Sequence, residues 1–431
     1  MRSFWRGVHP LFRRRWSSIE AMGALELRLP YRLIRPRSWP SPWLALGVLP
    51  AFLGALLFFG PPPWGWEEGV LVLLTALAHL LAFLSTDRMA RYPGKESWGI
   101  AAFNLLLFSL LLVAVLALGR LYYSRGYLLS ATFLCFPLLV FYLTRVPPVR
   151  LALVPGGVAD WLRAHVGEKL PIARLDEVEG VVADLHHLDP KALPLLAEAS
   201  LRGIPILHAA SVYEGYTGRV PLGPHFNEGL MALAEMDRGL YPWFKRLWEV
   251  GLVLFLSPLI LVLGVLVALL VYWDLGRPVI FAQERVGLGG RPFKAYKFRT
   301  MRGAPREGVY VGEEEARLTP LGRFLRRYRL DELPQFWNIL KGDMSLVGPR
   351  PEQRVLAEVY AKEIPLYPLR HSVRPGLTGW AQVQQGYTEG VEGTRLKLSY
   401  DLYYIKHLSF WLDLRILVKT LWVIGTGFGA R

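Results

Sequence analysis

Residues 247–273 read LWEVGLVLFLSPLILVLGVLVALLVYW, an apolar run longer than the roughly 20 residues that cross the hydrocarbon core of a bilayer. Ser257-Pro258 interrupts the run near its middle, where the missing proline N–H predicts a bend. Basic residues flank both ends, Lys245 and Arg246 before the run and Arg277 after it. Because positively charged flanks stay in the cytoplasm, the pattern predicts a re-entrant helix that turns back at the bend. A kinked helix that spans the membrane is the alternative.

Four further apolar runs precede this one, and each is near the length of a membrane span. They cover residues 43–60, 69–85, 99–118 and 127–144. Lys and Arg are concentrated before the first run, between the second and third, and after the fourth. This alternation predicts four transmembrane helices over residues 43–145, with the basic segment 1–42 and everything after Arg150 in the cytoplasm.

The composition of the 431 residues agrees with a membrane protein. Hydrophobic residues make up 52% and charged residues 20%, which excludes a disordered chain. The net charge of +15 suits anionic partners such as lipid headgroups, nucleic acid or phosphorylated substrates. Cys135 is the only cysteine, so a disulfide framework and a cysteine-based metal cluster are excluded.

Residues 146–240 read as a Rossmann-like α/β module that follows the membrane helices. Strands are expected over residues 149–154, 178–185 and 203–208, with helices over 158–166 and 190–201. The turn Pro155-Gly156-Gly157 lacks the G-x-G-x-x-G spacing of a dinucleotide site. We therefore expect packing, assembly or regulation from this module and no NAD.

The C-terminal part of the chain carries basic residues in two kinds of element. Residues 292–301 alternate apolar and basic positions, which predicts a half-buried strand that presents Lys297 and Arg299. A loop is expected over residues 303–316. Leu and Tyr at helical spacing over residues 318–328, with Arg326 among the intervening arginines, predict an amphipathic helix in the headgroup plane.

A second amphipathic stretch covers residues 410–424. Apolar residues including Trp411 and Trp422 share one face, and Asp413, Arg415 and Lys419 lie on the other. This pattern predicts another interfacial helix, with a core helix as the alternative.

Between these elements stands LDELPQ, residues 330–335, in which Asp331 and Glu332 are expected to open a helix. Carboxylates among arginines at a membrane interface could hold Mg²⁺, which binds hard oxygen ligands and bridges substrate phosphates. A carboxylate could also attack phosphorus to form an acyl phosphate. Arg350, between Pro349 and Pro351, has a restrained backbone suited to a planar phosphate contact.

Several strings from residue 244 to 421 resemble the bacterial sugar transferases that start glycan assembly on polyprenyl phosphate, the monotopic phosphoglycosyl transferases. The matching strings include QERVG (283–287), YKFRTM (296–301), LDELPQ (330–335), KGDMSLVGPRP (341–351), PGLTGWAQV (375–383) and SFWLD (409–413). The preceding helices and α/β module are similar to the long subgroup, which initiates exopolysaccharide and O-antigen synthesis. Glu249 departs from the family pattern, which commonly has Asp at that position.

The resemblance implies an α-rich catalytic domain over residues 241–431 and a role for each matching residue. Asp331 would attack the β-phosphate of a UDP-sugar, expel UMP and help to hold Mg²⁺. Polyprenyl phosphate would then take the phosphosugar from Asp331, with Glu332 as the residue that deprotonates or positions the acceptor. The residues implied to bind substrate are Lys297, Arg299, Arg326, Arg350 and Pro351.

The resemblance also implies the bacterial inner membrane, with the catalytic domain on the cytoplasmic face and no nucleic-acid partner. The large module over residues 150–222 favours a homodimer. Two alternatives remain: direct displacement without a covalent intermediate, and a non-catalytic scaffold that binds a nucleotide sugar. The motifs do not identify the sugar.

Overall fold

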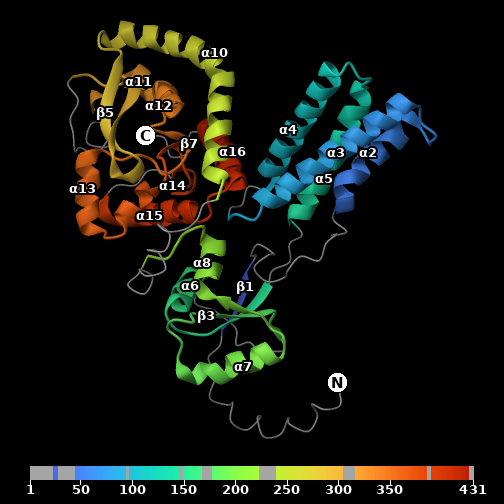
Figure 1. The fold of residues 1–431 in the computed structure, drawn as a ribbon, viewed down its shortest axis with the longest axis horizontal. Coiled ribbons are helices and arrows are strands. Elements are labelled where there is room, and N and C mark those ends of the chain that lie inside the picture. The colour runs from blue at the N-terminus through green and yellow to red at the C-terminus, as the bar shows by residue number, and fades with distance from the viewer. Residues whose placement is uncertain are drawn as a thin grey trace. The chain divides into compact units, whose positions relative to one another are not determined.

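The computed structural model describes residues 23–27, 44–93, 97–144, 149–166, 177–222, 239–303, 316–385 and 390–426. These residues fall into two compact units. One is built around a four-stranded sheet, and the other contains the apolar helices and the C-terminal domain (Figure 1).

The sheet has the strand order β1-β2-β3-β4, in which β1 is antiparallel to β2 and the other strands are parallel. The strands are β1 (Gly23–Leu27), β2 (Val149–Leu153), β3 (Gly180–Ala183) and β4 (Ile206–His208). The helices of this unit are α6 (Val158–Val166), η4 (Pro190–Ala192), α7 (Leu193–Leu201) and α8 (Ala209–Thr217). Its core joins buried residues of β2 and β3 to Leu195, Leu196 and Ala199 of α7. The predicted α/β unit is confirmed, its Rossmann-like classification stays a prediction, and strand β1 was not predicted.

The apolar runs before this unit form four helices, as predicted. They are α2 (Leu44–Phe59), α3 (Trp66–Met89), α4 (Ser97–Leu118) and α5 (Arg125–Thr144). By length and composition, α3, α4 and α5 could cross a membrane, whereas the apolar part of α2 over Gly47–Phe59 is shorter. Among the described residues, the fourth helix long enough to cross is α10 (Tyr241–Leu275).

Helix α10 has 35 residues and contains Pro258, and its ribbon turns sharply near the middle (Figure 1). The predicted bend is therefore confirmed. Few of its side chains are buried, and those that are lie in two groups: Lys245, Glu249 and Val253 before the bend, and Val267 and Val271 after it. In the first group Glu249 contacts β7, and the second group packs on Phe298 and Leu325.

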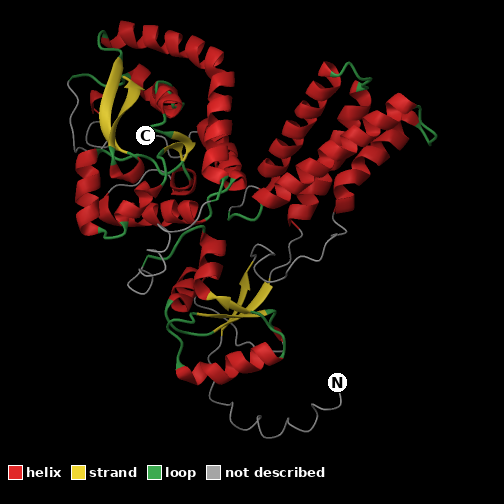
Figure 2. Ribbon diagram, in the orientation of Figure 1, coloured by secondary structure: helices red, strands yellow, loops and turns green. Residues whose placement is uncertain are grey.

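In the C-terminal domain, short helices surround two small sheets (Figure 2). One sheet is the antiparallel hairpin of β5 (Ile280–Val286) and β6 (Pro292–Phe298), and the other is the parallel pair of β7 (Ser345–Val347) and β8 (Gly376–Thr378). The helical elements are α11 (Pro320–Arg327), η7 (Leu330–Glu332), α12 (Gln335–Lys341), α13 (Arg354–Glu363), η8 (Tyr367–Ser372), α14 (Trp380–Gln385), α15 (Gly390–Lys406) and α16 (Phe410–Thr426). The predicted strand and basic helix are present as β6 and α11, and most of the predicted loop 303–316 lies outside the described residues.

Helix α16 buries the face that its pattern assigned to the polar side of an interfacial helix. Asp413, Arg415 and Lys419 are all buried, whereas Leu421 and Trp422 are more than half exposed. Asp413 pairs with Lys245 of α10 at 2.5 Å, Arg415 donates to the Met89 carbonyl at the end of α3, and Lys419 donates to Gln384. Protein partners distant in sequence, and not water, thus cover the polar face of α16, while its interfacial location stays a prediction.

Candidate active site

The buried side chain of Asn338 joins helix α12 to strand β6 by hydrogen bonds. Its Oδ1 accepts from the Tyr296 N–H at 3.1 Å, and its Nδ2 donates to the Lys294 carbonyl at 2.7 Å. Arg246 of α10 donates to the carbonyls of Ile339 and Leu340 at the end of α12. These contacts fix β6, and with it Lys297, against the segment that carries Asp331 and Glu332.

Asp331 and Glu332 lie in the short turn η7. The sequence predicts them in the first turn of the following helix, α12, and this prediction is wrong. The backbone of Arg329 adopts a left-handed conformation with φ of 54°, which ends α11 and starts the separate turn. Helix α12 begins only at Gln335, with Pro334 as its N-cap residue. Leu330 and Leu333 pack on the cluster of Val267, Val271, Phe298 and Leu325, so the turn is held directly against the second half of α10.

Glu332 is surrounded by basic groups. Its Oε1 accepts from Arg350 Nη2 at 2.6 Å and from Lys297 Nζ at 3.0 Å, and its Oε2 lies 3.6 Å from Arg329 Nη1. Burial alone would raise the pKa of Glu332, but Arg350, Lys297 and Arg329 hold it well below its usual range. Glu332 is therefore a fixed anion that orders three cations.

Asp331 has a different environment although it is the next residue and is equally buried, with 6% exposed against 5% for Glu332. Among the described residues, no hydrogen bond or ion pair engages its carboxylate. Burial raises the pKa of Asp331, against the opposing effect of Lys297. Adjacent carboxyl groups whose pKa values are pushed apart by their environments are a common arrangement in active sites. Here Asp331 is the carboxylate left available for chemistry.

Arg350 reaches Glu332 from the loop that follows β7. Gly348 N donates to the Thr378 carbonyl at 2.8 Å and the Pro349 carbonyl accepts from Gly376 N at 2.9 Å, which ties this loop to β8. A Cβ atom at Gly348 would lie 2.5 Å from the Arg374 carbonyl oxygen, so only glycine fits there.

The other residues predicted to bind substrate are placed as follows. Arg326 Nε donates to Thr300 Oγ1 at 3.0 Å. The positive charge of Arg326 partly opposes the rise that burial causes in the pKa of Asp331. The Arg299 guanidinium donates to backbone carbonyls, those of Leu275, Arg277, Met301 and Gly303. The Pro351 carbonyl accepts from Arg285 Nη1 at 2.8 Å. The structure thus brings Lys297 and Arg350 onto Glu332, while Arg299 is engaged at the C-terminal end of α10.

Asp331 also suits a Mg²⁺ ion, because its carboxylate offers hard oxygen ligands that no residue in the described part of the chain engages. Among the described residues, no group of three or more His, Cys, Asp or Glu side chains could hold a metal alone. Mg²⁺ commonly uses one or two carboxylates and takes its remaining ligands from water and substrate phosphates. The residues present therefore fit a Mg²⁺ ion that binds together with a phosphorylated substrate.

A second layer of buried and half-buried polar residues supports the loop that carries Arg350, and the sequence analysis did not identify it. Its residues are Arg285, Glu352, Tyr367, Arg370, Lys397 and Asp401. Lys397 and Glu352 form an ion pair. Burial opposes ionisation of Glu352, but Lys397 and Arg370 lower its pKa to about 2. The only signal in the sequence was that Arg285 belongs to one of the matching strings, because the other residues gain meaning only through contacts distant along the chain.

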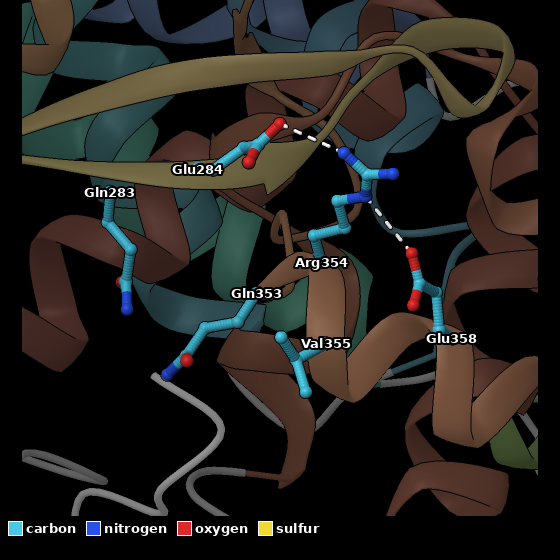
Figure 3. Close-up of a pocket in the computed structure, with 6 residues that line it drawn as sticks. All are labelled: Gln283, Glu284, Gln353, Arg354, Val355 and Glu358. Carbon is cyan, nitrogen blue, oxygen red and sulfur yellow. Dashed lines mark hydrogen bonds and ion pairs between the residues drawn. The ribbon is translucent and has the colours of Figure 1, made fainter. Parts of the chain in front are cut away.

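A pocket of about 230 Å³ is lined by residues of β5 and of the start of α13 (Figure 3). Arg354 stands between Glu284 of β5, at 3.4 Å, and Glu358 of α13, at 3.0 Å, and Gln283 and Gln353 complete the polar lining. Small-molecule sites usually enclose roughly 300–1,000 Å³. This pocket is smaller and includes neither Asp331 nor Glu332.

Comparisons with known proteins agree with this geometry. The family described as bacterial sugar transferase matches residues 240–427. The chain is 37% identical over 403 residues to a UDP-N-acetylgalactosamine-undecaprenyl-phosphate N-acetylgalactosaminephosphotransferase of Aeromonas hydrophila, covering 88% of this chain and 95% of the relative. It is 34% identical over 283 residues to a UDP-glucose:undecaprenyl-phosphate glucose-1-phosphate transferase of Escherichia coli K12, covering 62% of this chain and 59% of the relative.

A shorter relative aligns with less than half of the chain. The uncharacterized sugar transferase EpsL of Bacillus subtilis is 40% identical over 177 residues, which cover 41% of this chain and 85% of the relative. The match over nearly the whole Aeromonas protein, together with the family match around the Asp331–Glu332 turn, identifies the relationship. The chain belongs to the bacterial sugar transferase family.

Proposed function

We propose that this protein transfers a sugar-1-phosphate from a UDP-sugar to undecaprenyl phosphate and releases UMP. The observation that carries the proposal is the contrast within η7: three cations hold Glu332, whereas no side chain among the described residues pairs with Asp331. Relatives from Aeromonas hydrophila and Escherichia coli are named for this class of donor and acceptor. This transfer is the first membrane step of exopolysaccharide, O-antigen or capsule assembly.

The transfer has two steps. In the first, a carboxylate oxygen of Asp331 attacks the β-phosphorus of the UDP-sugar, the bond from that phosphorus to the bridging oxygen breaks, and UMP leaves. In the second, a phosphate oxygen of undecaprenyl phosphate attacks the same phosphorus and releases the Asp331 carboxylate. The product is undecaprenyl diphosphate-sugar.

The basic residues around Glu332 give this chemistry its electrostatic support. Arg350, Lys297 and Arg329 are already ordered by Glu332, so little reorganisation is needed when the diphosphate enters. Arginine offers paired N–H groups that match a phosphate. Glu332 is the residue that positions the acceptor phosphate through the same cations.

Asp331 is the residue that would hold Mg²⁺ together with the donor diphosphate. When bound, Mg²⁺ neutralises charge on the diphosphate and on the leaving UMP.

The bent helix α10 supports a re-entrant arrangement in the bacterial inner membrane, with the catalytic domain on the cytoplasmic face. Its exposed apolar residues before and after the bend, among them Phe255 and Leu261, suit contact with lipid. Because the turn η7 packs on the second half of α10, Asp331 would lie at the headgroup plane where the acceptor phosphate is found. We also expect the protein to form a homodimer.

The test is release of UMP from a panel of UDP-sugars by the protein in nanodiscs with Mg²⁺ and undecaprenyl phosphate. Asp331→Asn should lower release by at least about 10³-fold, because the nucleophile is lost. Glu358→Gln, an exposed carboxylate on α13, is the matched control and should retain full activity. Normal turnover by Asp331→Asn would refute the assignment of the nucleophile.

Isotope exchange tests the covalent step itself. Labelled UMP should appear in UDP-sugar without acceptor if an aspartyl phosphosugar forms. Transfer without such exchange would favour direct displacement, and binding without release of UMP would favour a scaffold.

A further inference from the structure

Three successive residues after β7 are each held by a different basic side chain. The Arg350 carbonyl accepts from Arg370 Nη2 at 2.8 Å, the Pro351 carbonyl accepts from Arg285 Nη1 at 2.8 Å, and the Glu352 carboxylate pairs with Lys397. Val286 N also donates to the Glu352 carbonyl at 3.1 Å. The backbone that carries Arg350 is therefore fixed from η8, β5 and α15.

Arg370 differs from the other two basic residues because it contacts Arg350 itself and because it is the most buried of the three. Only 2% of Arg370 is exposed. Two guanidinium nitrogens of Arg370 contact Asp401 Oδ2, Nη2 at 2.8 Å and Nε at 3.1 Å. The third nitrogen, Nη1, donates to the Tyr367 hydroxyl at 2.9 Å. Both Arg370 and Asp401 are thus enclosed, and the guanidinium has one orientation.

A continuous chain of contacts leads from this buried pair to the dyad. Asp401 holds Arg370, Arg370 holds the Arg350 carbonyl, and the Arg350 guanidinium reaches Glu332 Oε1 at 2.6 Å. Breaking the middle contact would remove the support that acts on the Arg350 carbonyl itself, from whose backbone the Arg350 side chain projects. A misplacement of about 1 Å in a catalytic group can slow a reaction by roughly 10²-fold.

We propose that Arg370 is a positioning residue for phosphosugar transfer, which places the Arg350 guanidinium against Glu332 by holding the Arg350 backbone carbonyl. This inference rests on the proposed function. Arg370 acts through Arg350 and touches neither substrate.

The experiment separates positioning from mere stabilisation by measuring the initial burst of UMP and the steady-state rate in nanodiscs. The burst amplitude counts active enzyme, and the burst rate reports the first chemical step. Arg370→Lys keeps the charge but loses the forked contact to Asp401, Tyr367 and the Arg350 carbonyl. It should lower the burst rate about 10- to 100-fold and leave the amplitude unchanged. Arg395→Lys, an exposed arginine on the same helix as Asp401, should change neither value.

A double-mutant cycle with Arg350→Lys shows whether the two arginines act as one unit. The double variant should be no more than about twofold slower than Arg350→Lys alone. The inference is overturned if the two single factors multiply, or if Arg370→Lys lowers only the amplitude.

If Arg370→Lys does not fold, Tyr367→Phe takes its place, because it keeps the guanidinium and removes one acceptor. Its burst rate should fall several-fold, without a further fall in the Arg350→Lys background, and an unchanged rate would overturn the inference. Absence of any transfer by the wild-type protein would refute the proposed function instead. Wild-type transfer without a burst would mean that the first chemical step limits the rate, and the cycle would then be decided on steady-state rates, which report that same step.

Discussion

At the scale of single residues, two neighbouring carboxylates of nearly equal burial have opposite electrostatic environments. Glu332 contacts Arg350, Lys297 and Arg329, while Asp331 has none of these contacts. The pKa of Glu332 is lowered and that of Asp331 is raised. The proposed division of roles, with Asp331 as nucleophile and Glu332 as organiser, therefore depends on the neighbouring residues and not on the carboxylates themselves.

The raised pKa of Asp331 predicts how activity depends on pH. Attack requires the ionised carboxylate, so activity should fall as the pH drops through this raised pKa. Lys297 favours the ionised form of Asp331, and its removal should raise the pKa of Asp331 further. Lys297→Met should therefore move the acidic limb of the rate profile to higher pH, as measured by UMP release between pH 5 and pH 9.

The matched control for this experiment is Lys294→Met, on the same strand with an exposed side chain. It should leave the acidic limb in place. A Lys297→Met profile that moves to lower pH, or that keeps the wild-type position, would contradict the electrostatic assignment.

Much of the site could be predicted from the sequence because its central residues stand in short distinctive strings. LDELPQ contains both carboxylates, and Lys297 and Arg350 stand in similar strings. The support behind Arg350 could not be predicted, because Arg370 and Asp401 are separated by 31 residues and show no local pattern. Arg299 shows the opposite problem, since it follows the strand pattern of Lys297 but lies just past the end of β6 and donates to the end of α10.

At the scale of elements, helix α10 is tied to β7 by one buried carboxylate. Glu249 accepts from Ser345 Oγ at 2.6 and 2.7 Å, and from the N–H groups of Leu346 and Val347 at 3.1 and 3.3 Å. Lys245 lies 3.2 Å away. The Glu249 carboxylate therefore reaches four donors on two elements.

Glu249→Gln should destabilise the protein, because the amide places a donor where the site supplies only donors. The expected loss is about 1–3 kcal/mol for the unmatched buried group. For a domain of this size, the Tm should fall by roughly 2–4 °C for each kcal/mol of stability that is lost. Thermal unfolding in detergent measures it, with the exposed Glu358→Gln as the control, and equal Tm values for both variants would contradict the prediction.

The topology of α10 can be tested by cysteine labelling. After Cys135 is replaced by alanine, single cysteines at Trp243 and Trp273 report the two ends of the helix, since both side chains are largely exposed. In inside-out vesicles the re-entrant arrangement predicts that an impermeant maleimide labels both positions. Labelling of one end from each side would instead establish a spanning helix.

The face of α16 shows what periodicity cannot predict. The pattern of polar and apolar residues was correct, but the environment of each face depends on Lys245, Met89 and Gln384, which lie elsewhere in the chain. Strand β1 was missed for a similar reason, since five residues gain strand structure only by pairing with β2. Helix and strand positions in the α/β unit were predicted because Gly and Pro bound each short apolar run.

At the scale of the whole molecule, the C-terminal domain contains every residue of the proposed site. The family match covers residues 240–427, and the Bacillus relative aligns with only 41% of this chain but with 85% of its own length, so a similar protein can be much shorter than this chain. The full-length chain adds contacts of α16 with α3 and α4. The ring centroids of Trp422 and Trp98 lie 5.5 Å apart, and Arg415 donates to the Met89 carbonyl.

A chain of residues 239–431 should therefore retain transfer within about tenfold of the full-length rate but unfold at lower temperature. Arg415→Met should lower the stability of the full-length protein by about 1–3 kcal/mol, because a buried carbonyl loses its donor. The same substitution should have little effect in the shorter chain, where that carbonyl is absent. UMP release and thermal unfolding of the four proteins measure this, and complete loss of transfer in the shorter chain would show that the membrane helices are needed for catalysis.

The packing of α10 on the dyad turn has a consequence for how this protein can change in evolution. Val267, nine residues after Pro258, packs on Phe298 and Leu325, about 14 Å along the helix from the bend. One inserted residue between them would rotate Val267 by about 100° and remove it from this contact. Insertions and deletions between Pro258 and Val267 are therefore compatible with the fold only in steps close to whole helical turns. The distance along α10 between the bend and the turn that carries Asp331 can then change only in increments of roughly 5 Å.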